Sequence, residues 1–212
     1  KEGKADIPMK GILQTSNFAR AILNRETGLI PASGRRLVSQ CGIFEYEGRF
    51  IMITDAAINI NPDVETQIGI VENALPVAKA LGNDCPKVAV LSAVENVTEK
   101  MVSTVTAAEI AKRGVPGCII SGPLALDGAI SMESVKHKAI HDPVAGQADI
   151  LLVPFIEIGN VLYKACTYIA GKTMASTICG ASCPVVITSR ADTPDSKYYS
   201  ILMAVLRCIK GC

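Results

Sequence analysis

The most constraining feature of the sequence is the alternation of short apolar runs with longer segments of helical period. Runs rich in β-branched residues predict strands at 87–93, 118–121, 150–153 and 184–188. The segments between them repeat their apolar residues every three or four positions, as amphipathic helices do. This alternation is the pattern of βαβ units, so the sequence predicts an α/β fold with a mostly parallel sheet.

Proline and glycine residues bound the helices of this pattern. Helical spacing extends over 62–82, 98–114 and 159–171, and a glycine closes each segment. Pro76 lies within the first segment and predicts a kink or a break there. A last helix is expected to start at Pro194, with Asp192 or Thr193 as its cap. Its apolar residues are expected on one side of the helix: Tyr198, Leu202, Val205 and Ile209.

One pair of strands departs from the parallel design. Residues 41–47 and 50–54 alternate as strands do, and only Gly48 and Arg49 separate them. So short a connection joins antiparallel neighbours. The sequence therefore predicts a hairpin within the otherwise parallel sheet.

Composition and charge limit the partners. The chain has 212 residues, of which 49% are hydrophobic, which is enough to bury one large core or two small ones. Lys and Arg total 21 against 20 for Asp and Glu, with no run of five like charges. This balance argues against a nucleic acid or an acidic membrane surface as a partner. The longest apolar stretch, 150–156, is far shorter than the roughly 20 residues that span a bilayer.

The cysteines and histidines do not form a recognisable metal motif. The eight cysteines lie in apolar settings, where a free thiol behaves as a small hydrophobic group, so we expect a reduced, cytoplasmic protein. Cys179 and Cys183 lack the two-residue spacing of a zinc knuckle and a second ligand pair. His137 and His141 are four residues apart on an expected helix, but the zincin glutamate does not follow the first. No metal is expected.

Four loops follow predicted strands and define an expected site. They are rich in glycine or polar residues and span 55–61, 122–127, 154–160 and 189–195. Ligands of open α/β sheets bind outside the carboxyl ends of the strands, so these loops are expected to form the rim. The sequence contains neither the dinucleotide-binding glycine motif nor the Walker A motif.

The loop 189–195 carries the most chemistry. Arg190 lies just before a helix N-terminus, where its guanidinium and free backbone N–H groups suit a phosphate or an acyl phosphate. Ser189 can donate a hydrogen bond to a developing oxyanion, and Asp195 can accept a proton. The alternative is structural: Asp192 and Asp195 cap the helix, and Arg190 pairs with one of them.

Several longer strings resemble one enzyme family. Together with Thr188, Ser189 and Arg190, they occur in order along the chain from about Ala5 onward, at 54–62, 86–92, 122–127, 143–154 and 159–164. In this combination they resemble the phosphate acetyltransferase and phosphate butyryltransferase family, and the butyryltransferase branch in particular.

The resemblance implies exchange of an acyl group between coenzyme A and phosphate, with coenzyme A as a substrate and no metal or redox cofactor. It also implies an isocitrate dehydrogenase-like fold, a cleft between two domains and a homodimer. On this comparison, residues 1–19 and 179–212 belong to the first domain and residues 20–178 form the second. Lys1 stands where the middle of the fold is expected, which suggests that the chain has lost its beginning.

The resemblance also assigns roles to residues. Ser189 and Arg190 match the family's serine and arginine, whereas the position of its basic aspartate falls on Ser196, so Asp195, one residue earlier, is the expected base. Lys10 stands near a second family arginine and is expected to bind phosphate as a point charge. Further substrate contacts are expected from Asp55, Asn59, Gly146, Gly159 and Asn160.

Other interpretations of the sequence stay open. Gly159 and Asn160 can simply start a helix, and Tyr163 and Lys164 are expected to be packing and surface residues. The close functional alternative is a phosphate acetyltransferase. The alternative of another class is a non-catalytic module that binds coenzyme A or an acyl phosphate.

Overall fold

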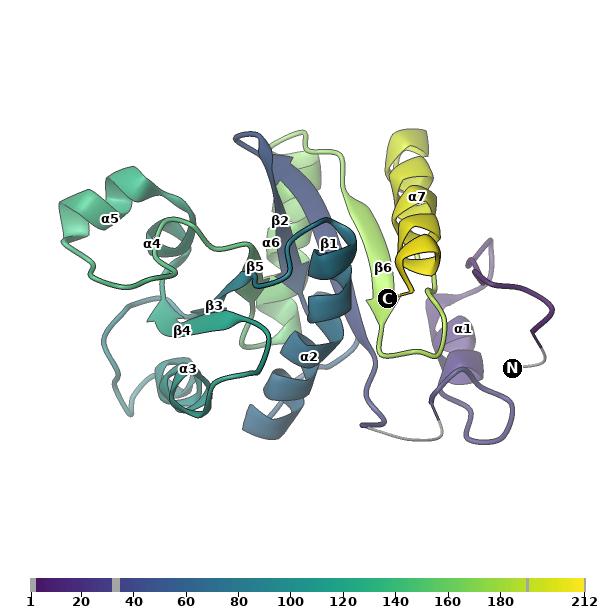
Figure 1. The fold of residues 1–212 in the computed structure, drawn as a ribbon, viewed down its shortest axis with the longest axis horizontal. Coiled ribbons are helices and arrows are strands. Elements are labelled where there is room, and N and C mark those ends of the chain that lie inside the picture. The colour runs from purple at the N-terminus through teal and green to yellow at the C-terminus, as the bar shows by residue number, and fades with distance from the viewer. Residues whose placement is uncertain (1–2, 32–34, 190, 212) are drawn as a thin grey trace.

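The computed structural model describes residues 3–31, 35–189 and 191–211 (Figure 1). A six-stranded sheet has the order β4-β3-β5-β2-β1-β6. Its strands are β1 (Ser39–Tyr46), β2 (Arg49–Thr54), β3 (Lys87–Leu91), β4 (Ile119–Leu124), β5 (Ile150–Leu152) and β6 (Ala175–Cys179). The helices are α1 (Thr15–Ile22), α2 (Val64–Ala80), α3 (Val102–Arg113), α4 (Leu126–Ile130), α5 (Met132–Lys138), α6 (Ile156–Tyr168) and α7 (Pro194–Lys210).

The sheet is parallel from β4 to β2 and antiparallel around β1. Strands β2, β5, β3 and β4 run parallel to one another, whereas β1 runs antiparallel to both β2 and β6. Glu47 and Gly48, at φ 51° and 78°, form the tight turn between β1 and β2, as such hairpins require. The predicted α/β class and the predicted hairpin are both confirmed.

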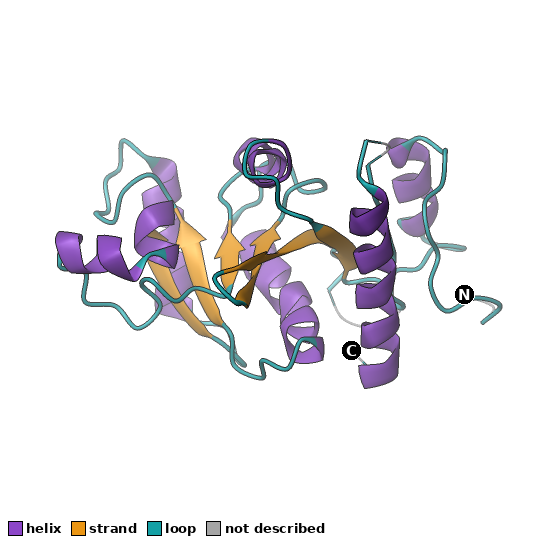
Figure 2. Cartoon of the chain, turned by 90° about the horizontal axis from the view of Figure 1, so that it is seen from above, coloured by secondary structure: helices purple, strands orange, loops and turns teal. Residues whose placement is uncertain are grey.

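The alternation of side chains along the strands separates two apolar cores. Val88 and Val90 of β3 pack with α2 and α3 on one face, and Ala89 packs with α4, α5 and α6 on the other. Figure 2 shows helices on both faces of the sheet. A strand buried on both faces has no polar side, which explains the continuous apolar runs in the sequence.

A third core lies at the end of the molecule where α1 and α7 flank β6 (Figure 1). Ile22, Val38, Ile178 and Val185 are its buried members. It joins segments from the two ends of the chain. Backbone pairing reinforces this contact, because the N–H of Lys10 donates to the carbonyl of Val186 at 3.0 Å.

Near the C-terminus one strand prediction fails and one strand was missed. Residues 184–188 form only isolated bridges, from Val185 to Ile178 and from Val186 to Met9. Val185 and Val186 are both buried, and Val185 belongs to the third core, which accounts for their apolar character. The strand in this region is β6, whose small and polar residues gave no apolar signal; pairing with β1 and cover by α7 bury it.

Some helix predictions need correction. Helix α2 continues through Pro76, so the predicted break does not occur. Helix α3 starts at Val102 because Thr98 lies in a turn held by the hydroxyl of Thr104, which accepts from the Thr98 N–H at 2.9 Å. His137 and His141 do not share a helix, since α5 ends at Lys138. Within the described ranges no helix is long and apolar enough to cross a membrane.

Helix α7 starts at Pro194 as predicted, and Thr193 caps it by accepting from the Ser196 N–H. The expected apolar stripe of this helix is exposed instead of packed on the sheet. Small and polar residues face β6, and the Ser200 hydroxyl accepts from the Ser176 N–H at 2.9 Å. Such residues let the helix approach the strand closely.

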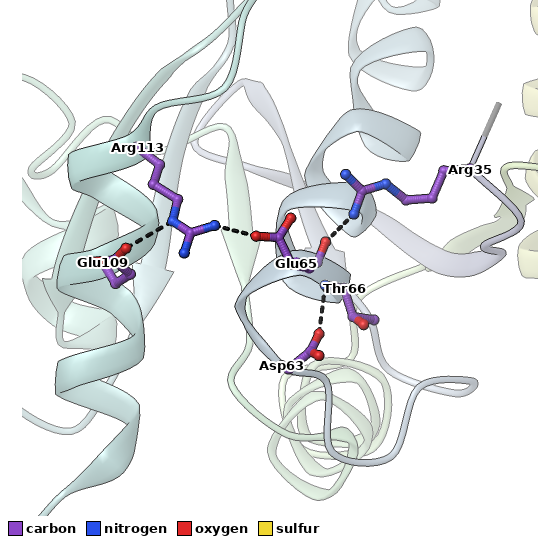
Figure 3. Close-up of polar contacts among 6 residues, drawn as sticks. All are labelled: Arg35, Asp63, Glu65, Thr66, Glu109 and Arg113. Carbon is purple, nitrogen blue, oxygen red and sulfur yellow. Dashed lines mark hydrogen bonds and ion pairs between the residues drawn. The ribbon is translucent and has the colours of Figure 1, made fainter.

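Arginine side chains link α2 to its surroundings (Figure 3). Arg113 of α3 pairs with Glu109, at 2.8 Å, and with Glu65 of α2. The backbone carbonyl of Glu65 accepts from Arg35. These groups are largely exposed, and exposed ion pairs contribute little. The apolar core beneath them therefore holds α2 in place.

Candidate functional site

A cavity of about 580 Å³ opens beside the antiparallel part of the sheet. Ser39 of β1 pairs with the last residue of β6, and Cys41 pairs with the last residue of β2, so β2 and β6 end at the same edge. The polar residues of the wall come from β1, α6, β6 and the loop before α7, and include Gln40, Tyr163, Lys164, Ser176, Ser189 and Asp192.

Three of the four predicted rim loops reach this cavity. The segments 55–61, 154–160 and 189–195 each contribute residues to its wall. The segment 122–127 lies at the far end of the sheet, in β4 and α4, so its predicted place at the rim is wrong for this cavity.

Asp55 organises the loop that follows β2. One carboxylate oxygen accepts from the backbone N–H groups of Gln40, Ala57 and Ile58, and the other accepts from the Asn59 backbone and side chain, all within 2.6–3.2 Å. Burial raises the pKa of Asp55, and these bonds oppose the increase. Asn59 also donates to the carbonyl of Val38 at 2.9 Å. Both side chains therefore hold the backbone of the cavity wall in place without lining the cavity themselves.

Gly159 and Asn160 fix α6 against this loop. A Cβ atom on Gly159 would lie 2.6 Å from the Asp55 carbonyl oxygen. Only glycine allows this approach. Asn160 lines the cavity and donates from its amide to the carbonyl of Ala56 at 3.2 Å.

Tyr163 reaches the cavity because Gly42 leaves room for its ring. A Cβ atom on Gly42 would lie 2.6 Å from the ring carbons of Tyr163. Burial raises the pKa of Tyr163, the charge of Asp192 adds to the increase, and a hydrogen bond with Ser176 opposes it. Gln40 donates to the Ser176 hydroxyl at 2.8 Å. Tyr163 therefore stays a neutral phenol, and it shares the cavity wall with Asp192.

Tyr163 packs against a buried core and Lys164 is exposed, as expected, but both also line the cavity, which the sequence did not predict. Their helical spacing was the available signal. Tyr163 and Lys164 stand three and four residues after Asn160, and Thr167 stands four and three residues after them, so the four residues form one polar face along α6.

The turn before α7 presents Ser189 and Asp192 to the cavity. Asp192 accepts from the Ser189 N–H at 2.6 Å, and the Ser189 hydroxyl accepts from the Ala191 N–H at 3.3 Å. Arg190 lies outside the described residues. Asp195 is exposed in the first turn of α7 and is not part of the cavity wall.

Lys10 and Gly146 lie away from the cavity wall. Lys10 is buried beside Val186, and its Nζ is 3.4 Å from the carbonyls of Gly11 and Leu13. Gly146 adopts φ 72°, and its N–H donates to the carbonyl of Gly128 in α4 at 2.8 Å. The structure thus assigns Gly146 a local packing role.

A second cavity, of about 610 Å³, lies between the hairpin and α7. Its wall is mostly apolar, and its charged residues Lys172 and Glu45 pair with each other at 3.7 Å. Of the predicted site residues, Ser189 and Asn160 line the first cavity, and the wall of the second contains none of those that the structure describes. The described part of the chain holds no cluster of three metal-binding side chains.

The sequence matches a known family and several relatives. The sequence model described as phosphate acetyl/butaryl transferase matches residues 1–205. A probable phosphate butyryltransferase of Bacillus subtilis is 48% identical over 205 residues, which cover 95% of this chain and 68% of that protein. A phosphate acetyltransferase of Thermotoga maritima is 41% identical over 209 residues, 97% of this chain and 71% of that protein.

A solved structure has the same fold. The crystal structure of a branched-chain phosphotransacylase from Enterococcus faecalis V583 superimposes with a TM-score of 0.89 at 41% identity. The match covers 97% of this chain and 74% of that protein.

The close approach of α6 predicts that Gly159→Ala is destabilising. The added Cβ must displace the backbone at Asp55, and overpacking of this kind costs about 1–3 kcal/mol. Urea unfolding measures the loss. Gly11→Ala is the matched control, because a Cβ there meets nothing within 4 Å. Equal stability of the two variants would contradict this account of the packing.

Proposed function

Because the chain belongs to the phosphate acetyl/butyryltransferase family, we propose that it transfers an acyl group between coenzyme A and phosphate. The observation that carries the proposal is the cavity at which the Ser189 turn meets the polar face of α6. A helix N-terminus and a lysine attract an anion, while hydroxyl groups suit a carbonyl oxygen.

Each of these residues is proposed to have a separate role in the reaction. Arg190 and Lys164 hold the phosphate, and the Ser189 hydroxyl stabilises the oxyanion that forms at the acyl carbon. Lys10 is kept as a phosphate ligand, as the sequence predicts. A thiol with a pKa of about 8.5 is only a few per cent thiolate at pH 7, so the attack on an acyl phosphate needs a base.

The proposed acyl group is butyryl. Leu23, Ile58, Ile178 and Ile187 give the cavity an apolar side, which suits a chain longer than acetyl. The relative from Clostridium beijerinckii, a phosphate butyryltransferase, is 45% identical over 210 residues. Acetyl transfer is the alternative.

The protein is further proposed to be a cytoplasmic homodimer that needs no cofactor beyond its substrates. The free cysteines of the described chain support a reducing compartment, and the exposed apolar stripe of α7 supports an assembly. The domain division at 19/20 and 178/179 stays a prediction. The third core, which joins the two ends of the chain, supports it, although α1 and β6 cross these boundaries.

We expect thiol release from butyryl-CoA in the presence of phosphate, followed with a thiol-reactive chromophore. Each methylene in an apolar pocket contributes roughly tenfold or more, so kcat/KM for butyryl-CoA should exceed that for acetyl-CoA by at least about tenfold. A ratio below one would favour the acetyltransferase. Binding of coenzyme A without phosphate-dependent release would favour the non-catalytic module.

Arg190→Ala is expected to lower kcat/KM more than about tenfold, because a charged hydrogen bond to phosphate is lost while the fold is kept. Arg25→Ala, at an exposed position, provides the matched control. Circular dichroism checks the fold of both variants. Unchanged kinetics of Arg190→Ala would remove this residue from the site.

A further inference from the structure

We infer that Asp192 is the general base of the transfer and takes the proton of the coenzyme A thiol. The inference rests on the proposed function and assigns to Asp192 the role that the sequence suggested for Asp195. Three carboxylates compete for this role: Asp55, Asp192 and Asp195. Their positions and hydrogen bonds distinguish them.

The side chain of Asp55 is fully engaged in structural hydrogen bonds. It is 2% exposed, and its two oxygens accept five hydrogen bonds from the surrounding loop and from β1. A carboxylate with this many donors cannot turn toward a substrate without leaving buried N–H groups unpaired. Asp55 therefore positions the wall and does not take the proton.

Asp195 is on the wrong side of α7. It follows Pro194 in the first helical turn and is exposed. The next residue, Ser196, points inward and is 3% exposed, and its hydroxyl accepts from the Met174 N–H at 3.3 Å. Successive positions on a helix point about 100° apart, so Asp195 points away from the buried side that Ser196 occupies. Neither residue lines the cavity.

Asp192 is the one carboxylate in the wall among the residues that the structure describes. The Ser189 N–H holds its Oδ2 at 2.6 Å, which fixes the side chain beside the residue proposed to stabilise the oxyanion. Its charge acts on Tyr163 of α6, which lines the same cavity. Base and oxyanion donor thus come from one short turn, and Tyr163 and Lys164 of α6 share the wall with them.

The proposed step balances as follows. The thiol proton moves to the Asp192 carboxylate while the sulfur forms a bond to the acyl carbon of butyryl phosphate. The tetrahedral oxyanion collapses, the bond between carbon and the bridging oxygen breaks, and phosphate leaves with that electron pair. The proton then passes from Asp192 to the departing phosphate, which gives butyryl-CoA and hydrogen phosphate and restores the carboxylate.

The test compares Asp192→Asn with the matched variant Asp195→Asn. Asparagine keeps an oxygen that accepts from the Ser189 N–H. We expect Asp192→Asn to lower kcat/KM for coenzyme A with butyryl phosphate by about 100-fold or more at pH 7. Asp195→Asn should stay within about twofold, because the residue it replaces is exposed outside the cavity wall.

The pH profile separates a base from a residue that only holds the turn. A base becomes dispensable once the thiol ionises, so the deficit of Asp192→Asn should shrink as the pH rises past about 8.5. A deficit that is the same at every pH, or a larger loss in Asp195→Asn, would overturn the inference. So would a rate of Asp192→Asn within about threefold of wild type at pH 7.

Two further measurements keep the outcome clear. A second variant, Asp192→Ser, keeps a hydroxyl group that can accept from the Ser189 N–H. It must show the same pH-dependent loss of kcat/KM, and it replaces Asp192→Asn as the test if that variant does not fold. The wild-type protein must first show exchange. Absence of exchange in wild type would reject the proposed function, whereas an active wild type with a normal Asp192→Asn would reject only the base.

Discussion

The buried carboxylate of Asp55 is the interaction on which the cavity depends. It draws in the N–H groups of the loop after β2 and one N–H of β1, so the strand and the loop are held together. Its backbone carbonyl lies against Gly159, which allows α6 to pack closely. Two elements of the cavity wall are thereby positioned by one residue. A lost donor here leaves a buried polar group unpaired, which costs far more than an ordinary hydrogen bond contributes.

The antiparallel strand β1 explains where the site lies. In a wholly parallel sheet the ligand loops follow consecutive strands along one edge. Here β1 reverses the direction between β2 and β6, so these two strands end at the same edge although one strand lies between them. The chain after β6 leads, through the third core, to the turn at Ser189. Residues far apart in the sequence, such as Gln40, Ser176 and Asp192, therefore share one wall.

The elements that depend on local pattern could be predicted from the sequence, whereas those that depend on tertiary contact could not. The hairpin and the start of α7 follow from Gly48 and Pro194, whose backbone preferences are local. Strand β6 is polar in sequence and becomes a strand only because β1 pairs with it. Likewise, Tyr163 enters the site only because Gly42, more than a hundred residues away, makes room for its ring. Neither fact is visible within one segment.

The choice of the proposed general base also depends on tertiary contact and not on local sequence alone. Sequence position alone favoured Asp195, because it stands one residue from the family position. The helical rotation between Asp195 and Ser196 reverses that preference, since the residue facing inward is the serine. The carboxylate that reaches the cavity lies in the turn before the helix, where Ser189 orients it. Lys164 of α6 lines the same cavity, so its wall contains both a negative and a positive side chain.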